Sequence, residues 1–272
     1  MSILTANKYL LGSQQTELQR LGLQHQIWAK EAHEAWNRAG FKQGDTILDF
    51  GCGPGFCSIE LGHRVGEKGK VVSVDLSDRY INFLEANANL HQVNVESHLA
   101  DLHEHSLPKQ SLDGAWCRWV LAWVENPSVV LNNIIPALKK GARLAIQEYY
   151  AWDFFRFFPF RPHLEKAVKM AFQSFEDTFA TINIGEQLPI QLANAGLCIQ
   201  SIRPITILAT PKDASWEWPK SFLTSYVPQL VSKGYMTNEE VENALLELEE
   251  VSQLEQATCL CPTVIEIVTE KS

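Results

Sequence analysis

Three glycines within five residues follow an acidic residue in the segment Asp49–Gly55, which reads DFGCGPG. Glycine has no Cβ atom, so the backbone can turn sharply there and come into contact with a ligand. The dinucleotide-binding pattern would require a glycine where Phe56 stands, and Pro54 removes a backbone donor that a pyrophosphate could use. The turn therefore favours a ligand that needs close backbone approach but has no diphosphate.

Two acidic residues end the next predicted strands and complete the outline of a pocket. Asp75 closes the run VVSVD twenty residues beyond Gly55, where a carboxylate can bind both hydroxyls of a ribose or cap the following helix. Leu76 would offer an apolar face to an adenine, while Asp101 could accept from its exocyclic amine and Leu102 could pack on the ring. Together these residues predict a nucleoside pocket with one ribose and no phosphate clamp.

The elements that position these residues alternate along the chain, which favours parallel strands joined by right-handed crossovers. Strands are predicted at 46–50, 70–75, 93–100, 113–118, 142–148, 198–208 and 258–269. Helices are predicted at 13–38 (with a break near Gly22), 56–65, 77–90, 129–139, 185–195 and 219–250, with a helical insertion at 154–184. We therefore predict an α/β fold with a doubly wound, mostly parallel seven-stranded sheet. Its ligands should lie beyond the carboxyl ends of the strands.

Composition and charge narrow the classes of function. The 272 residues are 46% hydrophobic and 20% charged, which excludes intrinsic disorder as the main state. A formal net charge of -9 argues against nucleic acid or an anionic membrane surface as the partner. No apolar run reaches the ~20 residues that span a bilayer, and the first residues lack a signal-peptide pattern. We predict a cytoplasmic protein whose six cysteines are buried, reduced thiols.

Two groups of residues resemble metal ligands without forming a convincing set. Cys259 and Cys261 would share one face of a strand, and His103 and His105 flank Glu104 in a predicted loop. Neither group has further ligands at a fixed spacing, so no metal site is predicted.

Five segments carry a resemblance to the class I S-adenosylmethionine (SAM)-dependent methyltransferases. They are ILDFGCGPG, VVSVDLS, ADLHEHSLP, SLDGAWCRWVLAWVENP and LNNIIPALKKGARLAIQE, which together cover 45–148. The flanking segments YLLG…ELQRLGLQH and NIGEQLPIQLANAGL are similar to those of ubiquinone-biosynthesis-type and natural-product small-molecule methyltransferases. The resemblance implies a Rossmann-like fold, SAM as cofactor, and an N-terminal helix that closes over it.

The same resemblance implies a division into four parts and a set of cofactor-binding residues. The parts are a helical lid at 1–40, a SAM-binding core at 41–150, a helical cap at 151–184, and the rest of the core sheet at 185–272 with a helical insertion at 219–254. Gly51 and Gly53, with Cys52 between them, would line the methionine portion of SAM, and Asp49 would orient their loop. Asp75 would bind the ribose, and Asp101 with Leu102 would bind the adenine, to which Leu76 offers an apolar face. The backbone at Cys117 would meet the amino-acid part.

The same resemblance also implies residues in the lid. Tyr9, Arg20 and Gln24 fall at lid positions, where Arg20 would pair with the SAM carboxylate or else be a solvated helix residue. Trp123 stands where many relatives carry histidine, so no catalytic histidine is transferred.

The acceptor side is indicated by the segment 149–160, YYAWDFFRFFPF, in which eight of twelve residues are aromatic. These rings could form an apolar acceptor pocket, pack inserted helices onto the core, or form a surface patch, and we favour a mixture of pocket and packing. Glu148, Tyr149 and Tyr150 are the candidates for acceptor contact or proton transfer. Residues 219–234 could form a flap over this site or an oligomer contact.

We therefore predict an enzyme that transfers a methyl group from SAM to a small, apolar or aromatic acceptor by in-line displacement. We expect a monomer or homodimer with no nucleic-acid partner and no integral membrane association. Two alternatives are a protein that binds SAM without catalysis and a nicotinamide-dependent oxidoreductase. Methylation of protein or RNA is a further alternative that the charge and the aromatic insertion disfavour.

Overall fold

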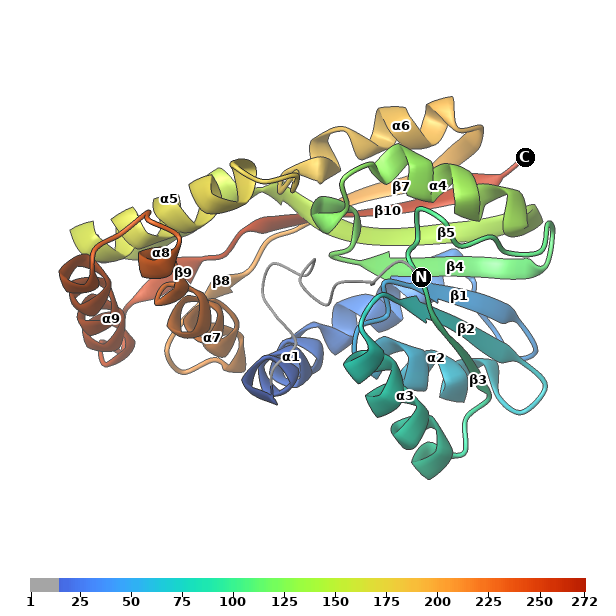
Figure 1. The fold of residues 1–272 in the computed structure, drawn as a ribbon, viewed down its shortest axis with the longest axis horizontal. Coiled ribbons are helices and arrows are strands. Elements are labelled where there is room, and N and C mark those ends of the chain that lie inside the picture. The colour runs from blue at the N-terminus through green and yellow to red at the C-terminus, as the bar shows by residue number, and fades with distance from the viewer. Residues whose placement is uncertain (1–14) are drawn as a thin grey trace.

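A seven-stranded sheet forms the centre of the structure, a computed structural model that describes residues 15–272 (Figure 1). Its strand order is β3-β2-β1-β4-β5-β10-β7. The strands are β1 (Thr46–Phe50), β2 (Lys70–Asp75), β3 (Val95–Leu99), β4 (Leu112–Arg118), β5 (Leu138–Ala151), β7 (Leu197–Ile205) and β10 (Thr263–Lys271). Only β10 runs antiparallel to its neighbours, β5 and β7. The predicted doubly wound, mostly parallel Rossmann-like sheet is therefore confirmed.

Helices cover both faces of this sheet (Figure 1). On one face lie α1 (Gln15–Ala39), α2 (Phe56–Val65) and α3 (Asp78–His91), and on the other α4 (Pro127–Ile134) and α6 (Leu188–Asn194). The second half of α1 packs with α2 around Trp36 and Leu61, which are both fully buried. This leaves the first half of α1 to project past the end of the sheet.

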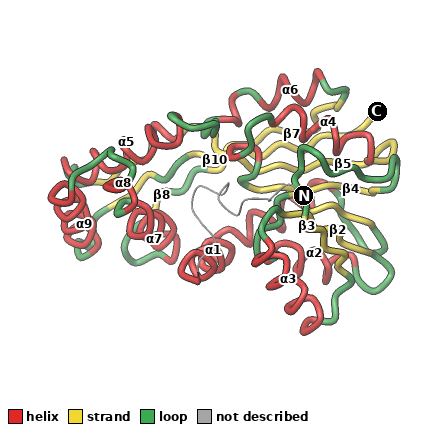
Figure 2. The backbone as a smooth tube through the Cα atoms, viewed as in Figure 1, coloured by secondary structure: helices red, strands yellow, loops and turns green. Residues whose placement is uncertain are grey.

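A second lobe extends from the sheet, on the left in Figure 2. It contains the helices α5 (Pro162–Glu176), α7 (Glu217–Tyr226), α8 (Gln229–Ser232) and α9 (Asn238–Ser252). It also contains a small antiparallel sheet of β6 (Arg156–Phe158), β9 (Thr258–Leu260) and β8 (Leu208–Ala209). Because α7 also contacts α1, this lobe and the N-terminal helix face each other across the end of the main sheet.

Local signals explain where the elements next to the site begin and end. The strands β1 and β2 are buried along almost their whole length, and each has adjacent apolar residues, Ile47-Leu48 and Val71-Val72, that face opposite sides of the sheet. The hydroxyl of Ser77 accepts a hydrogen bond from the backbone N–H of Tyr80 and caps α3. Asp75 therefore ends β2 without capping α3 itself, in contrast to the alternative considered from the sequence.

The helix α1 continues through Gly22, so the predicted break there is wrong. A Cβ atom on Gly22 would lie 3.2 Å from Cζ of Phe56, which means that the glycine lets α1 approach the ring closely. Glycine at this position therefore allows close packing against α2, and it does not break the helix.

The later elements differ more from prediction. The segment 154–184 is not purely helical, because β6 precedes α5. The predicted strands 198–208 and 258–269 are each divided in two, into β7 and β8 and into β9 and β10. Pro262 lies between β9 and β10 and cannot donate to a ladder. The predicted helix 129–139 ends at Ile134, because β5 already begins at Leu138.

Candidate active site

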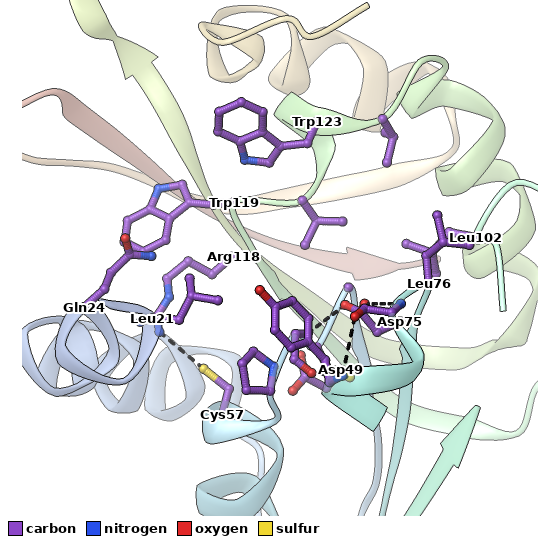
Figure 3. A pocket seen from close by; sticks show the side chains of 18 of the residues that line it. Leu21, Gln24, Asp49, Cys57, Asp75, Leu76, Leu102, Arg118, Trp119 and Trp123 are labelled. Atoms are coloured by element: carbon purple, nitrogen blue, oxygen red, sulfur yellow. Dashed lines mark hydrogen bonds between the residues drawn. The ribbon is translucent and has the colours of Figure 1, made fainter. Parts of the chain in front are cut away.

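A cavity of about 1200 Å³ opens where the carboxyl ends of β1, β2 and β4 meet α1 and α7. Pockets for one small ligand typically measure ~300–1,000 Å³, so this space is large enough for two ligands side by side. Figure 3 shows Asp75, Leu76 and Leu102 on one side of it and Trp119 and Trp123 on another. The cavity therefore has a polar end with nucleoside-binding features and an aromatic end.

The glycine turn forms part of the wall of the polar end. Gly51 and Gly53 have positive φ values of 65° and 54°, which favour glycine. A Cβ on Gly51 would lie 2.5 Å from both Cγ atoms of Val120, so only glycine fits against that side chain. No atom lies within 4 Å of the position that a Cβ of Gly53 would occupy. The open side of the turn therefore leaves room for a ligand against the bare backbone.

Asp49, in β1 just before the turn, connects this strand to α2, which follows the turn. Its Oδ2 accepts a hydrogen bond of 2.6 Å from the Ser58 hydroxyl, which in turn accepts one of 2.9 Å from Ser73. Burial raises the pKa of Asp49 to about 6, partly offset by the Ser58 hydrogen bond. The backbone N–H groups of Gly51 and Cys52 both donate to the carbonyl of Val74 on β2. The turn is thus tied to two neighbouring elements.

Asp75 connects the turn to β2. Its carboxylate accepts backbone N–H groups from Gly53 over 2.8 Å and from Ser77 over 2.9 Å. Burial raises the pKa of this carboxyl, while the backbone donors act in the opposite direction. Each carboxylate oxygen has a further lone pair, so Asp75 can still accept from the hydroxyls of a ligand.

Asp101 and Leu102 line the cavity at the end of β3, and Leu76 lines it beside Asp75. Oδ1 of Asp101 accepts the backbone N–H of His103 over 2.9 Å and lies 2.7 Å from its Nδ1. Leu76 and Leu102 lie on the same side of the cavity as Asp75 in Figure 3. Two apolar side chains beside two carboxylates make a surface suited to a flat heterocycle with polar edges.

The N-terminal helix supplies another wall. Arg20, Gln24 and His25 line the cavity. Arg20 is buried, donates to both carboxylate oxygens of Glu17 over 2.7 and 2.8 Å, and reaches Gln24 over 2.8 Å. The alternative of a solvated Arg20 is therefore wrong. The predicted lid residue Tyr9 lies outside the described residues.

Cys117, whose backbone was predicted to meet the amino-acid part of SAM, is not among the residues that line the cavity. Its side chain is fully buried in the core, and the wall after β4 is formed by Arg118, Trp119 and Val120. The guanidinium of Arg118 lies 5.1 Å from the ring centre of Trp119. The strand-end rule pointed to this loop, but it did not say which residue turns toward the cavity.

Aromatic rings line the other end, which we call the aromatic chamber. Its walls are Trp119, Trp123, Tyr149, Trp152, Phe155, Phe179, Trp218, Pro219, Phe222 and Pro262. The ring of Tyr149 stacks on Trp119 with centres 5.6 Å apart, and Trp119 stacks on Trp218 with centres 5.7 Å apart. Part of the predicted flap at 219–234 thus contributes to the chamber through Pro219 and Phe222. The sequence did not indicate that Trp218 lines the cavity, nor that it does so together with Trp119, Trp123 and Trp152. These four side chains come together only in the folded chain.

The aromatic segment 149–160 divides by position. Tyr149, Trp152 and Phe155 line the cavity, and Phe157 packs on Trp216 outside it. Four others are exposed at the surface: Tyr150, Phe154, Phe158 and Phe160. The segment is therefore part pocket, part packing and part surface.

Glu148 and Tyr150 are not placed to contact an acceptor, which corrects two further predictions. Tyr150 is 41% exposed and does not line the cavity. Glu148 is 0% exposed, and its Oε1 accepts the backbone N–H groups of Val120 and Leu121 over 2.7 and 2.6 Å. Burial raises the pKa of Glu148 to about 8, against the effect of these donors. Glu148 therefore holds the loop after β4 from behind the cavity wall.

The histidines and cysteines do not assemble into a metal site in residues 15–272. His98 and His105 pack with ring centres 5.0 Å apart, and His103 pairs with Asp101. Five cysteines are buried as free thiols, but Cys198 is exposed, which corrects its predicted burial. None of the helices in this described part of the chain is long and apolar enough to cross a membrane.

Comparison with known proteins agrees with this geometry. Residues 41–200 match a family described as "Methyltransferase domain". The chain is 29% identical over 196 residues to an uncharacterized 37.1 kDa protein in transposon TN4556 of Streptomyces fradiae, covering 72% of this chain and 55% of that protein. It is 31% identical over 129 residues to a 2-phytyl-1,4-naphtoquinone methyltransferase of Nostoc sp., covering 47% of this chain and 55% of that enzyme. The chain thus spans about half the length of these curated relatives.

A solved structure shows the same fold at low identity. The crystal structure of the [4+2]-cyclase SpnF superposes with a TM-score of 0.58 and 15% identity, covering 89% of this chain and 80% of that one. The resemblance to SAM-dependent methyltransferases stated from the sequence, and the cofactor that goes with it, are confirmed at the level of the family. The alternative of a nicotinamide-dependent oxidoreductase is set aside.

Proposed function

This chain belongs to the methyltransferase-domain family, and we propose that it transfers a methyl group from SAM to a small, apolar or aromatic acceptor by in-line displacement. The observation that carries this proposal is that the polar end and the aromatic chamber are parts of one cavity. A donor and an acceptor held in such a cavity can be aligned while water is kept out. Alignment of this kind can lower a barrier by ~7–11 kcal/mol.

The polar end fits the cofactor because of its own geometry. The free space at Gly53 admits a ligand against the backbone, and Asp75 keeps lone pairs for the two hydroxyls of a ribose. Leu76, Leu102 and Asp101 would hold the adenine. Gly51, with Arg20 and Gln24 from α1, would face the amino-acid part. When bound, SAM supplies a methyl group made electrophilic by a positively charged sulfur.

The aromatic chamber supports an apolar acceptor. Tyr149 is the one ionisable side chain among the ten described residues named above as its walls, and the guanidinium of Arg118 lies beside them, 5.1 Å from the ring centre of Trp119. Burial raises the pKa of Tyr149, so its phenol stays protonated and donates a hydrogen bond to the acceptor without removing a proton from it. We therefore propose an acceptor whose attacking atom is already nucleophilic near neutral pH. The rings also provide faces that favour a cationic methyl donor by ~0.5–2 kcal/mol.

The name of one similar enzyme is consistent with an apolar or aromatic acceptor. The Nostoc enzyme is named for a naphthoquinone that carries a phytyl chain, which is an aromatic and apolar molecule. The net charge of -9 also favours a small molecule over nucleic acid. A cytoplasmic location and a monomeric or homodimeric state remain predictions.

Two measurements test the proposal in sequence. Calorimetry with SAM and its demethylated product should show binding by the wild-type protein, and much weaker binding after Gly53→Val. Methyl-labelled SAM, added with the protein to a cell extract, should then label an organic-soluble small molecule. A labelled protein or RNA would overturn the proposed acceptor class. Binding of SAM with no labelled product would favour the alternative of a protein that binds SAM without catalysis.

A further inference from the structure

A cysteine, a histidine and a glutamate lie in line beside the polar end of the cavity. Sγ of Cys57 is 3.7 Å from Nδ1 of His25, and Nε2 of His25 is 3.0 Å from Oε1 of Glu60. Cys57 and Glu60 both belong to α2, one turn apart, while His25 comes from α1. A nucleophile next to a base that is itself oriented by a third group is the arrangement found in nucleophilic catalysis.

The surroundings of this trio favour a negatively charged sulfur. Cys57 is the second residue of α2, where the backbone N–H groups and the helix dipole attract negative charge. Nη2 of Arg118 lies 3.5 Å from its Sγ and 3.2 Å from Nδ1 of His25. Once His25 holds the thiol proton, both His25 and Arg118 can donate hydrogen bonds to the sulfur. Reactive cysteines are typically found next to such cationic groups and helix N-termini.

Glu60 keeps the imidazole in place. Burial opposes its ionisation, yet hydrogen bonds from His25 and His33 lower the pKa of Glu60 to about 2. Burial likewise opposes protonation of His25, but its hydrogen bonds to Cys57 and Glu60 raise the pKa of His25 to about 9. The ring of His25 also stacks on Phe56 with centres 5.6 Å apart. The imidazole of His25 is therefore held by contacts with three side chains, those of Cys57, Glu60 and Phe56.

The trio is reachable from the cavity, and a matched cysteine lies nearby. Cys57 and His25 both line the cavity. Cys52 lines it as well, and each cysteine is 9% exposed. Cys52, however, has Asp75 and Asp49 as charged neighbours, and burial together with these carboxylates raises its pKa well above the usual range. The two thiols thus have equal access but opposite electrostatic surroundings.

We propose that Cys57 is a nucleophilic modification site for α,β-unsaturated carbonyl compounds that enter the cavity, with His25 as its base and Glu60 as the group that orients His25. At pH 7 His25 holds the proton that it shares with the Cys57 sulfur, and the sulfur forms a bond to the β-carbon. The electron pair of the C=C bond moves to the carbonyl oxygen as an enolate. His25 then returns the proton to the α-carbon, so that no leaving group, oxidant or reductant is needed. This inference does not depend on methyl transfer.

N-ethylmaleimide, an α,β-unsaturated carbonyl compound, is a suitable probe for the full chain. Timed labelling at pH 7, followed by peptide mass mapping, gives a rate for each cysteine. We expect Cys57 to react at least about tenfold faster than Cys52, because only Cys57 has a histidine and an arginine beside its sulfur, whereas Cys52 faces Asp75 and Asp49. This comparison uses two residues of the same wild-type molecule, so it does not depend on the folding of any variant. A rate for Cys57 equal to or below that of Cys52 would overturn the proposal.

Variants then test the roles of the partners. His25→Gln should slow the labelling of Cys57 about tenfold or more while the rate of Cys52 stays unchanged, because only Cys57 loses its base. Glu60→Gln should slow it less. His33→Gln is the matched control, since His33 also contacts Glu60 over 2.6 Å but is exposed and does not line the cavity. Equal rates for Cys57 in wild type and His25→Gln would remove His25 from the mechanism and contradict the proposal.

Discussion

The carboxylate of Asp75 accepts the backbone N–H of Gly53 over 2.8 Å, so the residue that ends β2 also holds the turn that follows β1. The same carboxylate accepts the N–H of Ser77, the residue that caps α3. One half-buried side chain thus links two strands, a turn and a helix. Because both oxygens already accept backbone donors, a ligand that adds hydroxyl donors meets a group whose orientation is fixed in advance.

Asp75→Asn tests this link. An amide can accept from only one of the two N–H groups, and its NH₂ then faces the other donor. Loss of a hydrogen bond to a charged group costs about 1.5–3 kcal/mol, so we expect SAM affinity to fall by at least about tenfold in calorimetry. Asp113→Asn is the control, because Asp113 also accepts a backbone N–H, from Thr46 over 2.9 Å, but lies away from the cavity. Wild-type affinity in Asp75→Asn would contradict the proposed ribose contact.

The free space in front of Gly53 leads to a second prediction. Gly53→Ala should fold, because no atom lies within 4 Å of the new Cβ, but the methyl group would occupy the ligand's place against the backbone. The positive φ of 54° costs about 1 kcal/mol for a residue with a side chain. Gly44→Ala is matched to it, since Gly44 also has a positive φ and open space but is not part of the cavity.

For this pair we expect similar small decreases in melting temperature and a loss of SAM binding in Gly53→Ala alone. Thermal denaturation and calorimetry on the two variants separate the effect of backbone strain from the effect on the site. If both variants bind SAM like the wild type, the ligand does not approach the backbone at Gly53.

Two strands and the helix between them could be predicted from the sequence to the residue. The boundaries of β1, α2 and β2 match those predicted, because strands buried on both faces have adjacent apolar residues and the glycine turn marks where one ends. The small sheet of β6, β9 and β8 was missed, since strands of two or three residues leave no periodic pattern.

The candidate site was predicted only in part, because only some of its residues belong to a local sequence pattern. Residues of the glycine turn and the strand ends are adjacent to recognisable local patterns, and they do line the cavity. Cys117 was assigned to it as a backbone contact and Glu148 as a side-chain contact, but neither residue lines the cavity. The strand pleat turns the side chain of Glu148 into the protein. Trp119 and Trp218 stack although they are 99 residues apart in the chain, and no local pattern indicates that contact.

The buried carboxyl of Glu148 predicts a dependence of stability on pH. Its pKa is about 8 in the folded protein against 4.5 for the free side chain, so the folded state binds more protons between these values. The free energy of unfolding therefore falls as pH rises through this window, by ~1.4 kcal/mol for each pH unit crossed. In Glu148→Gln the side-chain oxygen can still accept from Val120 and Leu121 without this titration.

Urea denaturation of wild type and Glu148→Gln at pH 5, 7 and 9 measures this contribution. Other titrating groups are common to both proteins, so the difference between the two free energies isolates Glu148. We expect the variant to gain stability relative to wild type as pH rises, by a total on the order of a few kcal/mol. A difference that stays constant from pH 5 to 9 would show that the folded carboxyl titrates at its ordinary pKa.

Phe222 tests whether the aromatic chamber holds the acceptor. Its ring lines the cavity and packs on Trp152 with centres 5.6 Å apart, whereas Phe157 packs on Trp216 outside the cavity. Both phenylalanines are buried, with 8% and 4% of their surfaces exposed, so leucine in either place removes a similar ring. Each change should cost roughly 1 kcal/mol of stability through imperfect packing.

Only Phe222→Leu should slow methyl transfer, by about tenfold, because a misplaced acceptor loses the alignment that in-line displacement requires. Calorimetry should show unchanged SAM binding in both variants, since neither ring is at the polar end of the cavity. The readout is the initial rate of label transfer from methyl-labelled SAM to the small molecules of the extract. Equal rates in Phe222→Leu and Phe157→Leu would place the acceptor outside the chamber.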